Sequence, residues 1–316
     1  MESLPVIDAA LLPGGPQPAG DPRVGALLRE VCERHGFFYL RNHDIDPPLI
    51  DEVFAQTARL FALPLADKLA LDRAHSRCNR GYEPLRAQTL QSGAPPDLKE
   101  GFYLGTDLPP DDPRVLAGRF NQGPNQWPSG LPGFRETMQR YFDQCYRLAG
   151  RVVRGLALSL DLPVGFFDAY LTDASATLRL LHYPPQPARP APGEKGCGEH
   201  TDFGGVTLLL QDDCGGLQVR DPASGGWSDA PPRPGPFVVN LGDPFPPWTN
   251  DRYQSTLHRV VNLSGRERYS VPFFFTGNPD HRVQCLPTCL AAGEAPRHPT
   301  VTVEQHLRAC YQRTYA

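Results

Sequence analysis

Apolar residues recur along this chain at two different spacings, and the spacing changes near residue 177. Before that point they recur three and four positions apart, which is typical of helices with one buried face. Beyond it, short runs rich in β-branched and aromatic residues alternate with turn residues, which is typical of strands. The pattern therefore predicts a mainly helical first region and a sheet-rich second region.

The first region carries clear boundary signals. Asp21 and Pro22 suit the N-cap and first turn of a helix, and Gly36 suits its end. We expect a short strand at residues 37–40, helices at 48–61 and 132–160, and long loops with short strands over 76–126.

The second region predicts six strands and a closing helix. Such short, regularly spaced strands favour a β-sandwich, barrel or jelly roll. Five prolines make residues 184–192 a stiff connection rather than a flexible linker. The expected strands are residues 178–183, 206–211, 217–219, 237–241, 256–261 and 269–275, and the closing helix is 303–313.

These elements predict an α+β protein. Residues 1–165 form a helical and mixed N-terminal region, and residues 166–316 form an antiparallel jelly-roll region. We expect one cooperative unit, because no flexible linker separates the two.

Composition narrows the function classes. The net charge of −4 and the lack of a Lys/Arg run argue against nucleic acid or an anionic membrane as a partner. No apolar run approaches the roughly 20 residues of a membrane span, and residues 1–8 do not resemble a signal peptide. Eight scattered cysteines fit free thiols in a reducing compartment. We expect a cytoplasmic protein; its oligomeric state stays open.

A metal site is the first chemical hypothesis. In an extended strand, His200 and Asp202 would point to the same side. His258 is the candidate third ligand. Two imidazoles and one carboxylate make the facial triad of non-haem iron(II) oxygenases, which leaves coordination positions open.

A carboxylate receptor is the second hypothesis. Arg268 and Ser270 share one face of a strand, next to the metal strand if the sheet is antiparallel. A guanidinium beside a hydroxyl suits a carboxylate. An ordinary salt bridge at the start of a strand would explain Arg268 equally well on its own.

Many short motifs, in order along nearly the whole chain, resemble the isopenicillin N synthase-like family of iron(II)/2-oxoglutarate dioxygenases. In the first half these are LPVID at 4–8, GFFYL at 36–40 with NH at 42–43, RGY at 80–82, DLKE at 97–100 and NQWP at 125–128. In the second half they are LRLLHYP at 178–184, GEHTDFGG at 198–205, GGLQV at 215–219, VNLGD at 239–243, WTN at 248–250, STLHRVVN at 255–262 and RYS at 268–270.

The resemblance implies a double-stranded β-helix, a distorted jelly roll, with an N-terminal helical region. It implies that His200, Asp202 and His258 ligate Fe(II), and that Arg268 and Ser270, with Tyr183 nearby, hold the distal carboxylate of 2-oxoglutarate. It also implies O2 as cosubstrate, ascorbate as a stimulant, and succinate and CO2 as products. A small organic molecule would be hydroxylated, desaturated or cyclised at an unactivated C–H bond, and the breadth of the family suggests secondary metabolism.

The substrate pocket should be largely apolar with a few polar anchors. For about half of its aromatic candidates we expect plain core packing instead. The candidates are Phe102, Tyr103, Asn121, Leu181, Phe203, Phe245, Trp248 and Phe273.

One segment departs from the family pattern, and four histidines do not suit the metal. Residues 244–247 read PFPP, which should stiffen this connection and alter the pocket or a dimer surface without loss of iron. His182 should face away from Leu181 and Tyr183, and His43 should have a hydrogen-bonded structural role. His281 and His298 should be solvated.

Three other functions stay open at this point. An oxidase of the same family would bind its substrate directly to iron without 2-oxoglutarate, and succinate release would distinguish it. A non-catalytic small-molecule binding protein could use the same scaffold, but the triad argues against it. A zinc hydrolase is disfavoured because no motif supplies a base.

Overall fold

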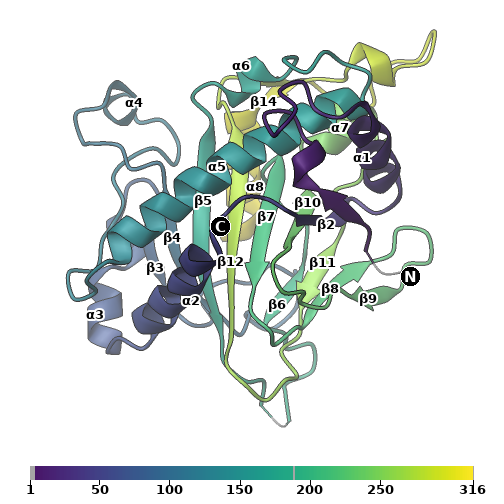
Figure 1. The fold of residues 1–316 in the computed structure, drawn as a ribbon. Coiled ribbons are helices and arrows are strands. Elements are labelled where there is room, and N and C mark those ends of the chain that lie inside the picture. The colour runs from purple at the N-terminus through teal and green to yellow at the C-terminus, as the bar shows by residue number, and fades with distance from the viewer. Residues whose placement is uncertain (1–3, 188, 316) are drawn as a thin grey trace.

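The computed structural model describes residues 4–187 and 189–315, and two facing sheets form its centre (Figure 1). The large sheet has the strand order β1-β2-β10-β7-β12-β5-β4-β3, and the small sheet has the order β6-β11-β8-β9. Except for the parallel β1–β2 pair, the neighbours in both sheets are antiparallel. This is the expected α+β fold with a distorted jelly roll.

The strands of the large sheet are β1 (Val6–Asp8), β2 (Phe37–Arg41), β3 (Gly81–Glu83), β4 (Glu100–Gly105), β5 (Ser175–Tyr183), β7 (Val206–Gln211), β10 (Phe237–Leu241) and β12 (Arg268–Gly277). Those of the small sheet are β6 (Cys197–His200), β8 (Leu217–Arg220), β9 (Trp227–Asp229) and β11 (His258–Val260). A separate pair consists of β13 (Arg282–Val283) and β14 (Val301–Thr302).

Helices cover the outer face of the large sheet, and α5 crosses it diagonally with α1 and α2 beside it (Figure 1). The α-helices are α1 (Pro22–Arg34), α2 (Pro47–Phe61), α3 (Leu65–Ala70), α4 (Pro113–Leu116), α5 (Phe134–Ser159), α6 (Asp168–Leu171), α7 (Phe245–Thr249) and α8 (Val303–Tyr315). Short 3₁₀ turns occur at Ala9–Leu11, Arg73–His75 and Pro287–Cys289.

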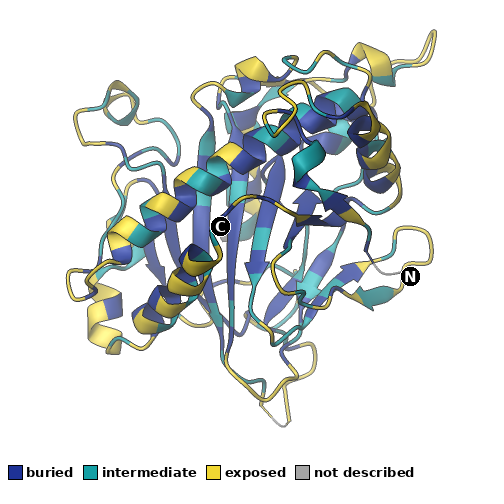
Figure 2. Cartoon of the chain, in the orientation of Figure 1, coloured by how far each residue is buried: buried dark blue, intermediate teal, exposed yellow. Residues whose placement is uncertain are grey.

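The main core lies between α5 and the large sheet, where the buried faces of both meet (Figure 2). Side chains alternate along β12. Phe273 and Phe275 therefore pack against Phe142 and Tyr146 of α5, whereas Phe274 faces the space between the sheets. This alternation leaves the inner face of the large sheet available for a site.

Most predicted elements are confirmed. Strands β7 and β10 have the predicted bounds, and α1, α2 and α5 match within two residues. As predicted, Asp21 caps α1 by accepting from the amide of Arg23 at 2.9 Å. The six-residue helix α3 was not predicted, because a single turn and a half gives too little periodicity to detect.

The two predicted regions share one sheet. Strands β1 to β4 come from the first region and pair with β5, β7, β10 and β12 of the second. The boundary between the two regions at residue 165 stays a prediction. Because strands from both sides of it pair in one sheet, the structure favours the single cooperative unit that we expected. Among the described residues, no helix combines the length and the apolar character that crossing a membrane would require.

The proline-rich departure forms the helix α7. Pro246 and Pro247 are the second and third of its five residues, and the amides of a first helical turn have no partner within the helix, so a missing amide hydrogen costs little there. Phe245 and Trp248 are buried in the main core. The expectation that Phe245 and Trp248 line the substrate pocket is therefore wrong, because the helical turn directs both rings inward against Tyr253 and Phe167.

Candidate metal centre

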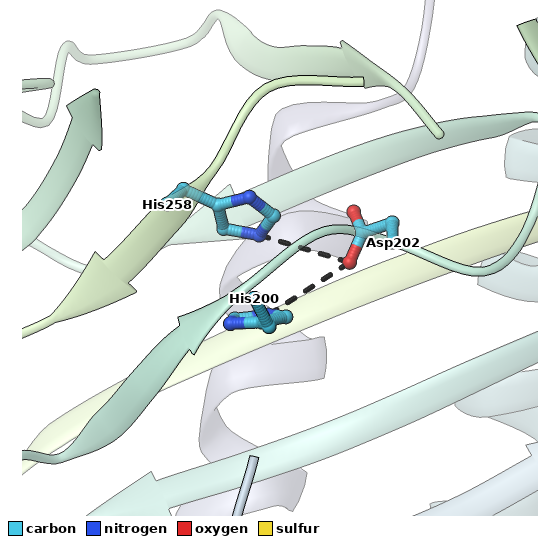
Figure 3. Close-up of side chains that lie close together, drawn as sticks. All are labelled: His200, Asp202 and His258. Atoms are coloured by element: carbon cyan, nitrogen blue, oxygen red, sulfur yellow. Dashed lines mark ion pairs between the residues drawn. The ribbon is translucent and has the colours of Figure 1, made fainter. Parts of the chain in front are cut away.

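Three ligand-type side chains converge between the two sheets (Figure 3). His200 ends β6, and His258 begins β11, directly opposite it in the antiparallel pair. The Nε2 atoms of His200 and His258 lie 3.9 and 3.7 Å from Oδ1 of Asp202. Two atoms that are both bonded to one ion at about 2.0–2.2 Å can be at most about 4.4 Å apart. The three side chains therefore fit a single divalent ion.

Hydrogen bonds fix the orientation of each of these side chains. The Nδ1 atoms of His200 and His258 contact the carbonyl oxygens of Gly198 and Thr256, at 2.8 and 3.1 Å. Both imidazoles can donate from Nδ1, which leaves Nε2 with a free lone pair for a metal.

The carboxylate is held in the same way. Oδ2 of Asp202 accepts from Thr207 at 2.6 Å and from Asn240 at 2.7 Å. Oδ1, the oxygen nearest both imidazoles, receives neither of these bonds and is free to bind an ion.

The environment favours the protonation states that bind metal. Burial lowers the pKa of His200, and burial together with the neighbouring His200 lowers the pKa of His258 to about 4. Burial alone would raise the pKa of Asp202, but the two histidines, Asn240 and Thr207 outweigh it and lower this pKa. Two neutral imidazoles and one carboxylate suit iron(II), because they add a single negative charge to the centre.

Asp202 reaches the centre by a route that differs from our expectation. We expected His200 and Asp202 to share one face of an extended strand, but β6 ends at His200 and Asp202 lies in the loop that follows. The turn after β10 holds this loop, since the amide of Asp243 donates to the carbonyl of Asp202 at 2.8 Å. A side chain on Gly242 would collide with that same carbonyl oxygen. Glycine at this position is therefore required by the close backbone approach.

Arg268 also lies elsewhere than expected relative to the metal strands. We placed it beside the metal strand, but β12 pairs with β5 and β7 in the large sheet, whereas β6 and β11 belong to the small sheet. Arg268 therefore faces the three ligands across the interior of the jelly roll. Arg268 and the three ligands line the same cavity.

The Arg268 side chain is fully buried without a negative partner among the described residues. Its guanidinium donates to the Gly215 carbonyl at 2.6 Å, to Ser270 Oγ at 3.2 Å and to Gln211 Oε1 at 3.3 Å, and lies over the ring of Tyr183. A buried cation that has only neutral partners is unfavourable unless an anion joins it. This position is therefore suited to an anionic ligand.

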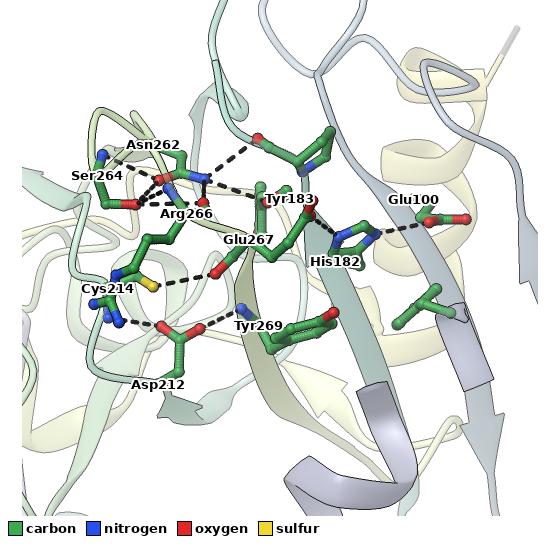
Figure 4. Close-up of polar contacts among 12 residues, drawn as sticks. Glu100, His182, Tyr183, Asp212, Cys214, Asn262, Ser264, Arg266, Glu267 and Tyr269 are labelled. Atoms are coloured by element: carbon green, nitrogen blue, oxygen red, sulfur yellow. Dashed lines mark hydrogen bonds and ion pairs between the residues drawn. The ribbon is translucent and has the colours of Figure 1, made fainter. Parts of the chain in front are cut away.

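Polar contacts brace the start of β12 from the outside (Figure 4). Asp212 accepts from the amide of Tyr269 at 2.5 Å. His182 contacts Glu100 at 2.7 Å and Glu267 on its other nitrogen, and stacks on Tyr269. As expected, His182 faces away from the cavity.

The remaining histidines follow our expectations only in part. His43 contacts the Gly235 carbonyl at 2.8 Å and accepts from the Ile45 amide, in line with a structural role. His281 and His298 were expected to be solvated, and both are partly exposed. His281 packs against Tyr170 and Trp248, and His298 forms an ion pair of 2.6 Å with Asp251.

Two cavities meet at His200 and Asp202, which line both. The first runs from His200, Asp202 and His258 to Arg268 and Ser270, and we call it the inner cavity. The second leads from His200 and Asp202 outward to α8, and we call it the outer cavity. Leu90, Arg179 and Phe274 line both.

The predicted pocket residues divide into two groups. Tyr103, Asn121 and Phe203 line the outer cavity, and Leu181 lines the inner one. Phe102 and Phe273, like Phe245 and Trp248, belong to the core instead. Phe102 and Phe273 were misplaced because each occupies the outward position of a two-residue alternation, where it packs against a helix.

Several cavity residues were not predicted. Thr177 and Arg179 share the inward face of β5 with Leu181 and Tyr183, so the alternation could have identified them. Gln88 comes from a loop, and Leu307 and Tyr311 come from α8. No sequence signal places these segments at the cavity.

Comparison with known proteins agrees with this site. Residues 4–130 match the N-terminal family of the non-haem dioxygenases in morphine synthesis, and residues 174–277 match the 2OG-Fe(II) oxygenase superfamily.

Two curated relatives and a solved structure resemble nearly the whole chain. A 2-oxoglutarate-Fe(II) type oxidoreductase of Emericella nidulans is 48% identical over 305 residues, which cover 95% of this chain and 87% of the relative. The clavatol oxidase of Penicillium crustosum is 38% identical, covering 99% and 97%. A full-length protein of Neurospora crassa, solved in complex with α-ketoglutarate and thymine, superposes with a TM-score of 0.83 at 32% identity, covering 98% and 97%. With its His200, Asp202 and His258 triad, the chain belongs to the 2OG-Fe(II) oxygenase superfamily.

Proposed function

We propose that this Fe(II)- and 2-oxoglutarate-dependent dioxygenase binds 2-oxoglutarate in the inner cavity and oxidises a small, partly polar molecule in the outer cavity. The observation that carries the proposal is the position of the triad between the two cavities. Two reactants bound in separate cavities would meet at the metal, and their geometry would favour reaction between them.

The inner cavity suits 2-oxoglutarate because of its charges. The guanidinium of Arg268, with Ser270 beside it, would pair with the distal carboxylate. The Tyr183 ring lies against the Arg268 guanidinium, and its hydroxyl would complete this receptor. The opposite end of the molecule would bind the metal at the positions that the triad leaves open.

The outer cavity has a mixed lining that supports a partly polar substrate. Phe203, Phe274 and Leu307 supply apolar surface, while Asn121 and Arg179 supply polar groups. Arg179 is held by an ion pair with Glu83, donates to Gln88 at 3.1 Å and lies over the Tyr103 ring. A rigid guanidinium of this kind favours a substrate that has a carbonyl or carboxylate oxygen.

The protein groups would position the reactants and exclude water, and the metal would supply the difficult step. Bound iron(II) supplies the O2 chemistry that couples the decarboxylation of 2-oxoglutarate to oxidation of a C–H bond. Arg268 would fix the orientation of the cosubstrate, and Asp202 with the two imidazoles would hold the ion. Phe203 and Phe274 would hold the substrate beside it and exclude water.

The relatives support small molecules as substrates. The Neurospora crassa structure contains thymine, and the Penicillium relative is a clavatol oxidase. We therefore propose a similar role in secondary metabolism for this chain, without nucleic acid or membrane as a partner. A cytoplasmic location is supported by eight free cysteines, which suit a reducing compartment. Stimulation by ascorbate stays a prediction.

The experiment is a substrate screen that measures succinate. Purified protein would receive Fe(II), 2-oxoglutarate and O2, with thymine, clavatol and a panel of small carbonyl and carboxylate compounds. A true substrate should raise succinate formation above the uncoupled rate, with about one succinate per oxidised product. Product without succinate would contradict the proposal and indicate an oxidase that does not use 2-oxoglutarate.

Binding of Fe(II) and 2-oxoglutarate should be detectable without turnover. Under anaerobic conditions, Fe(II) and 2-oxoglutarate together should give the weak visible absorption of their chelate, and Arg268→Ala should require more 2-oxoglutarate to reach it. If wild-type protein gave no such absorption, the inner cavity would not be the cosubstrate site.

A further inference from the structure

A second group of metal-ligating side chains lies near the triad but shares no residue with it. It consists of Asp243, His306 and Cys310, and we call it the α8 cluster. Each residue offers one ligand atom, and these atoms all lie within 4.8 Å of one another. The Cys310 sulfur lies 3.6 Å from Nε2 of His306. The proposed reaction uses none of these residues.

The two ligands on α8 have a spacing that metal sites use. His306 and Cys310 are four positions apart, so their side chains lie one above the other on the same face of the helix. Two ligands at this spacing on one helix can bind the same ion. The third ligand comes from a different element, the turn between β10 and α7, so an ion here would join α8 to that turn.

The Asp243 carboxylate is already oriented by its neighbours. Its Oδ1 accepts from Ser255 at 2.8 Å, and its amide donates to the carbonyl of Asp202 at 2.8 Å. Nε2 of His306 lies 3.2 Å from the carbonyl oxygen of Phe203. An ion bound at Nε2 would replace this contact, with the ring proton on Nδ1, and the carbonyl oxygen or a water molecule would supply the fourth ligand.

We propose that Asp243, His306 and Cys310 form a zinc site that fastens α8 to the turn after β10. Thiolate, imidazole and carboxylate are the ligands that zinc takes in tetrahedral sites. The triad has no sulfur ligand, so the two sites differ in chemical preference. This assignment rests on the cluster alone and does not depend on the proposed reaction.

The surroundings are compatible with this ligand set. Burial lowers the pKa of His306, which favours the neutral imidazole that binds metal. Burial raises the pKa of the Cys310 thiol to about 11, so zinc has to displace a proton, which passes to solvent. The Arg313 guanidinium donates to the sulfur at 3.3 Å, and such a bond stabilises a thiolate that also binds a metal.

The position of the α8 cluster gives it a structural consequence. Leu307 and Tyr311, which each follow a cluster residue on α8, line the outer cavity. An ion bound to His306 and Cys310 would therefore hold this wall of the cavity more firmly in place. Zinc should slow amide hydrogen exchange across residues 303–313.

Cobalt(II) provides the test, because cobalt bound to a thiolate gives a near-ultraviolet charge-transfer absorption and cobalt bound only to His and Asp does not. The metal-free full-length protein would be titrated with Co(II). Wild-type protein should bind two ions and show the thiolate absorption. His258→Ala should bind one ion and keep the absorption, while Cys310→Ser should bind one ion and lose it.

The matched control is Cys197→Ser, because this buried cysteine lies 3.8 Å from Nδ1 of His200. It should keep the thiolate absorption. The proposal is overturned if wild-type protein shows no thiolate absorption, or if Cys310→Ser keeps it while Cys197→Ser loses it. His306→Gln, which retains the thiol, should weaken cobalt binding at the second site. Unchanged affinity in His306→Gln would also contradict the ligand set.

Discussion

The inner and outer cavities share the metal centre but are built in different ways. The inner cavity is lined mostly by residues of paired strands, among them His258, Arg268 and Ser270. The outer cavity combines strands β4, β5 and β12 with loop residues such as Gln88 and Asn121 and with Leu307 and Tyr311 of α8. Strand register fixes the positions in the inner cavity, whereas loops and one helix shape the outer cavity.

This difference suggests that the two cavities have different roles in the reaction. A ladder of hydrogen bonds holds a side chain within a narrow range of positions, which suits a ligand that is the same in every reaction cycle. Loops and terminal helices tolerate sequence change, which suits the recognition of varied substrates. We therefore expect changes in the inner cavity to stop the reaction, and changes in the outer cavity to alter which molecule reacts.

The largest effect should come from the metal ligands. His258→Ala removes one of three ligands, so succinate formation should fall to the level of the metal-free protein. The melting temperature should change little, because the only hydrogen bond that its ring forms with the described residues is to the Thr256 carbonyl. His281→Gln, which changes a histidine outside both cavities, is the control and should keep its activity. Normal turnover in the His258→Ala variant would show that His258 is not a metal ligand.

The next largest effect should appear at the carboxylate receptor. Arg268→Ala removes a buried cation, and losing one partner of a buried charge pair costs about 2–5 kcal/mol, or roughly 30- to 5,000-fold in affinity. The KM for 2-oxoglutarate should rise within this range. Arg266→Ala is the control, because Arg266 forms an exposed pair with Asp213 and should leave that KM unchanged. Equal KM values for 2-oxoglutarate in both variants would contradict the proposal that Arg268 binds its distal carboxylate.

The contrast between strands and loops also explains how much of the site could be predicted from the sequence. His200, His258, Arg268 and Ser270 could be identified because their spacing matches the two-residue period of a strand or a family motif. The pairing of strands could not be predicted, so Arg268 was placed beside the metal strand instead of across from it. Spacing along one strand carries no information about which strand lies next to it.

The outer cavity was harder to predict for a physical reason. An aromatic residue in a strand can face a helix or a cavity, and both environments are apolar. Phe273 and Phe274 are adjacent, yet the first packs on α5 and the second lines both cavities. Only the position of α5 distinguishes them, and that position depends on the tertiary fold.

This pair of neighbours gives a third prediction, of intermediate size. Phe273→Leu should lower the free energy of unfolding by about 1–2 kcal/mol, because it leaves a gap in the core against Phe142. Phe274→Leu should lower it by less, but should change the ratio of product to succinate. Chemical denaturation and coupled assays on both variants would test this. If Phe274→Leu lost more stability than Phe273→Leu, our assignment of the two faces would be wrong.

The smallest predicted effect concerns His182, which contacts Glu100 and Glu267 on the outer side of the sheet near Arg268. Burial alone would lower the pKa of His182, but its hydrogen bonds to Glu100 and Glu267 outweigh burial and raise it. A raised pKa in the folded state means that the charged imidazole stabilises the protein. This stabilisation is fully present below the unfolded value of about 6.5 and is lost as the pH rises through the folded value. Because Glu267 is half exposed, the contribution should be below about 1 kcal/mol.

A double comparison isolates this contribution. The difference in unfolding free energy between wild type and His182→Gln should be larger at about pH 6 than at about pH 9. His43 is the matched control, because burial lowers its pKa and the folded state then binds fewer protons than the unfolded state. Its difference should therefore stay constant or grow as the pH rises. If the two histidines gave the same pH dependence, the two carboxylates beside His182 would not hold its proton, and β12 would be fixed by its strand neighbours alone.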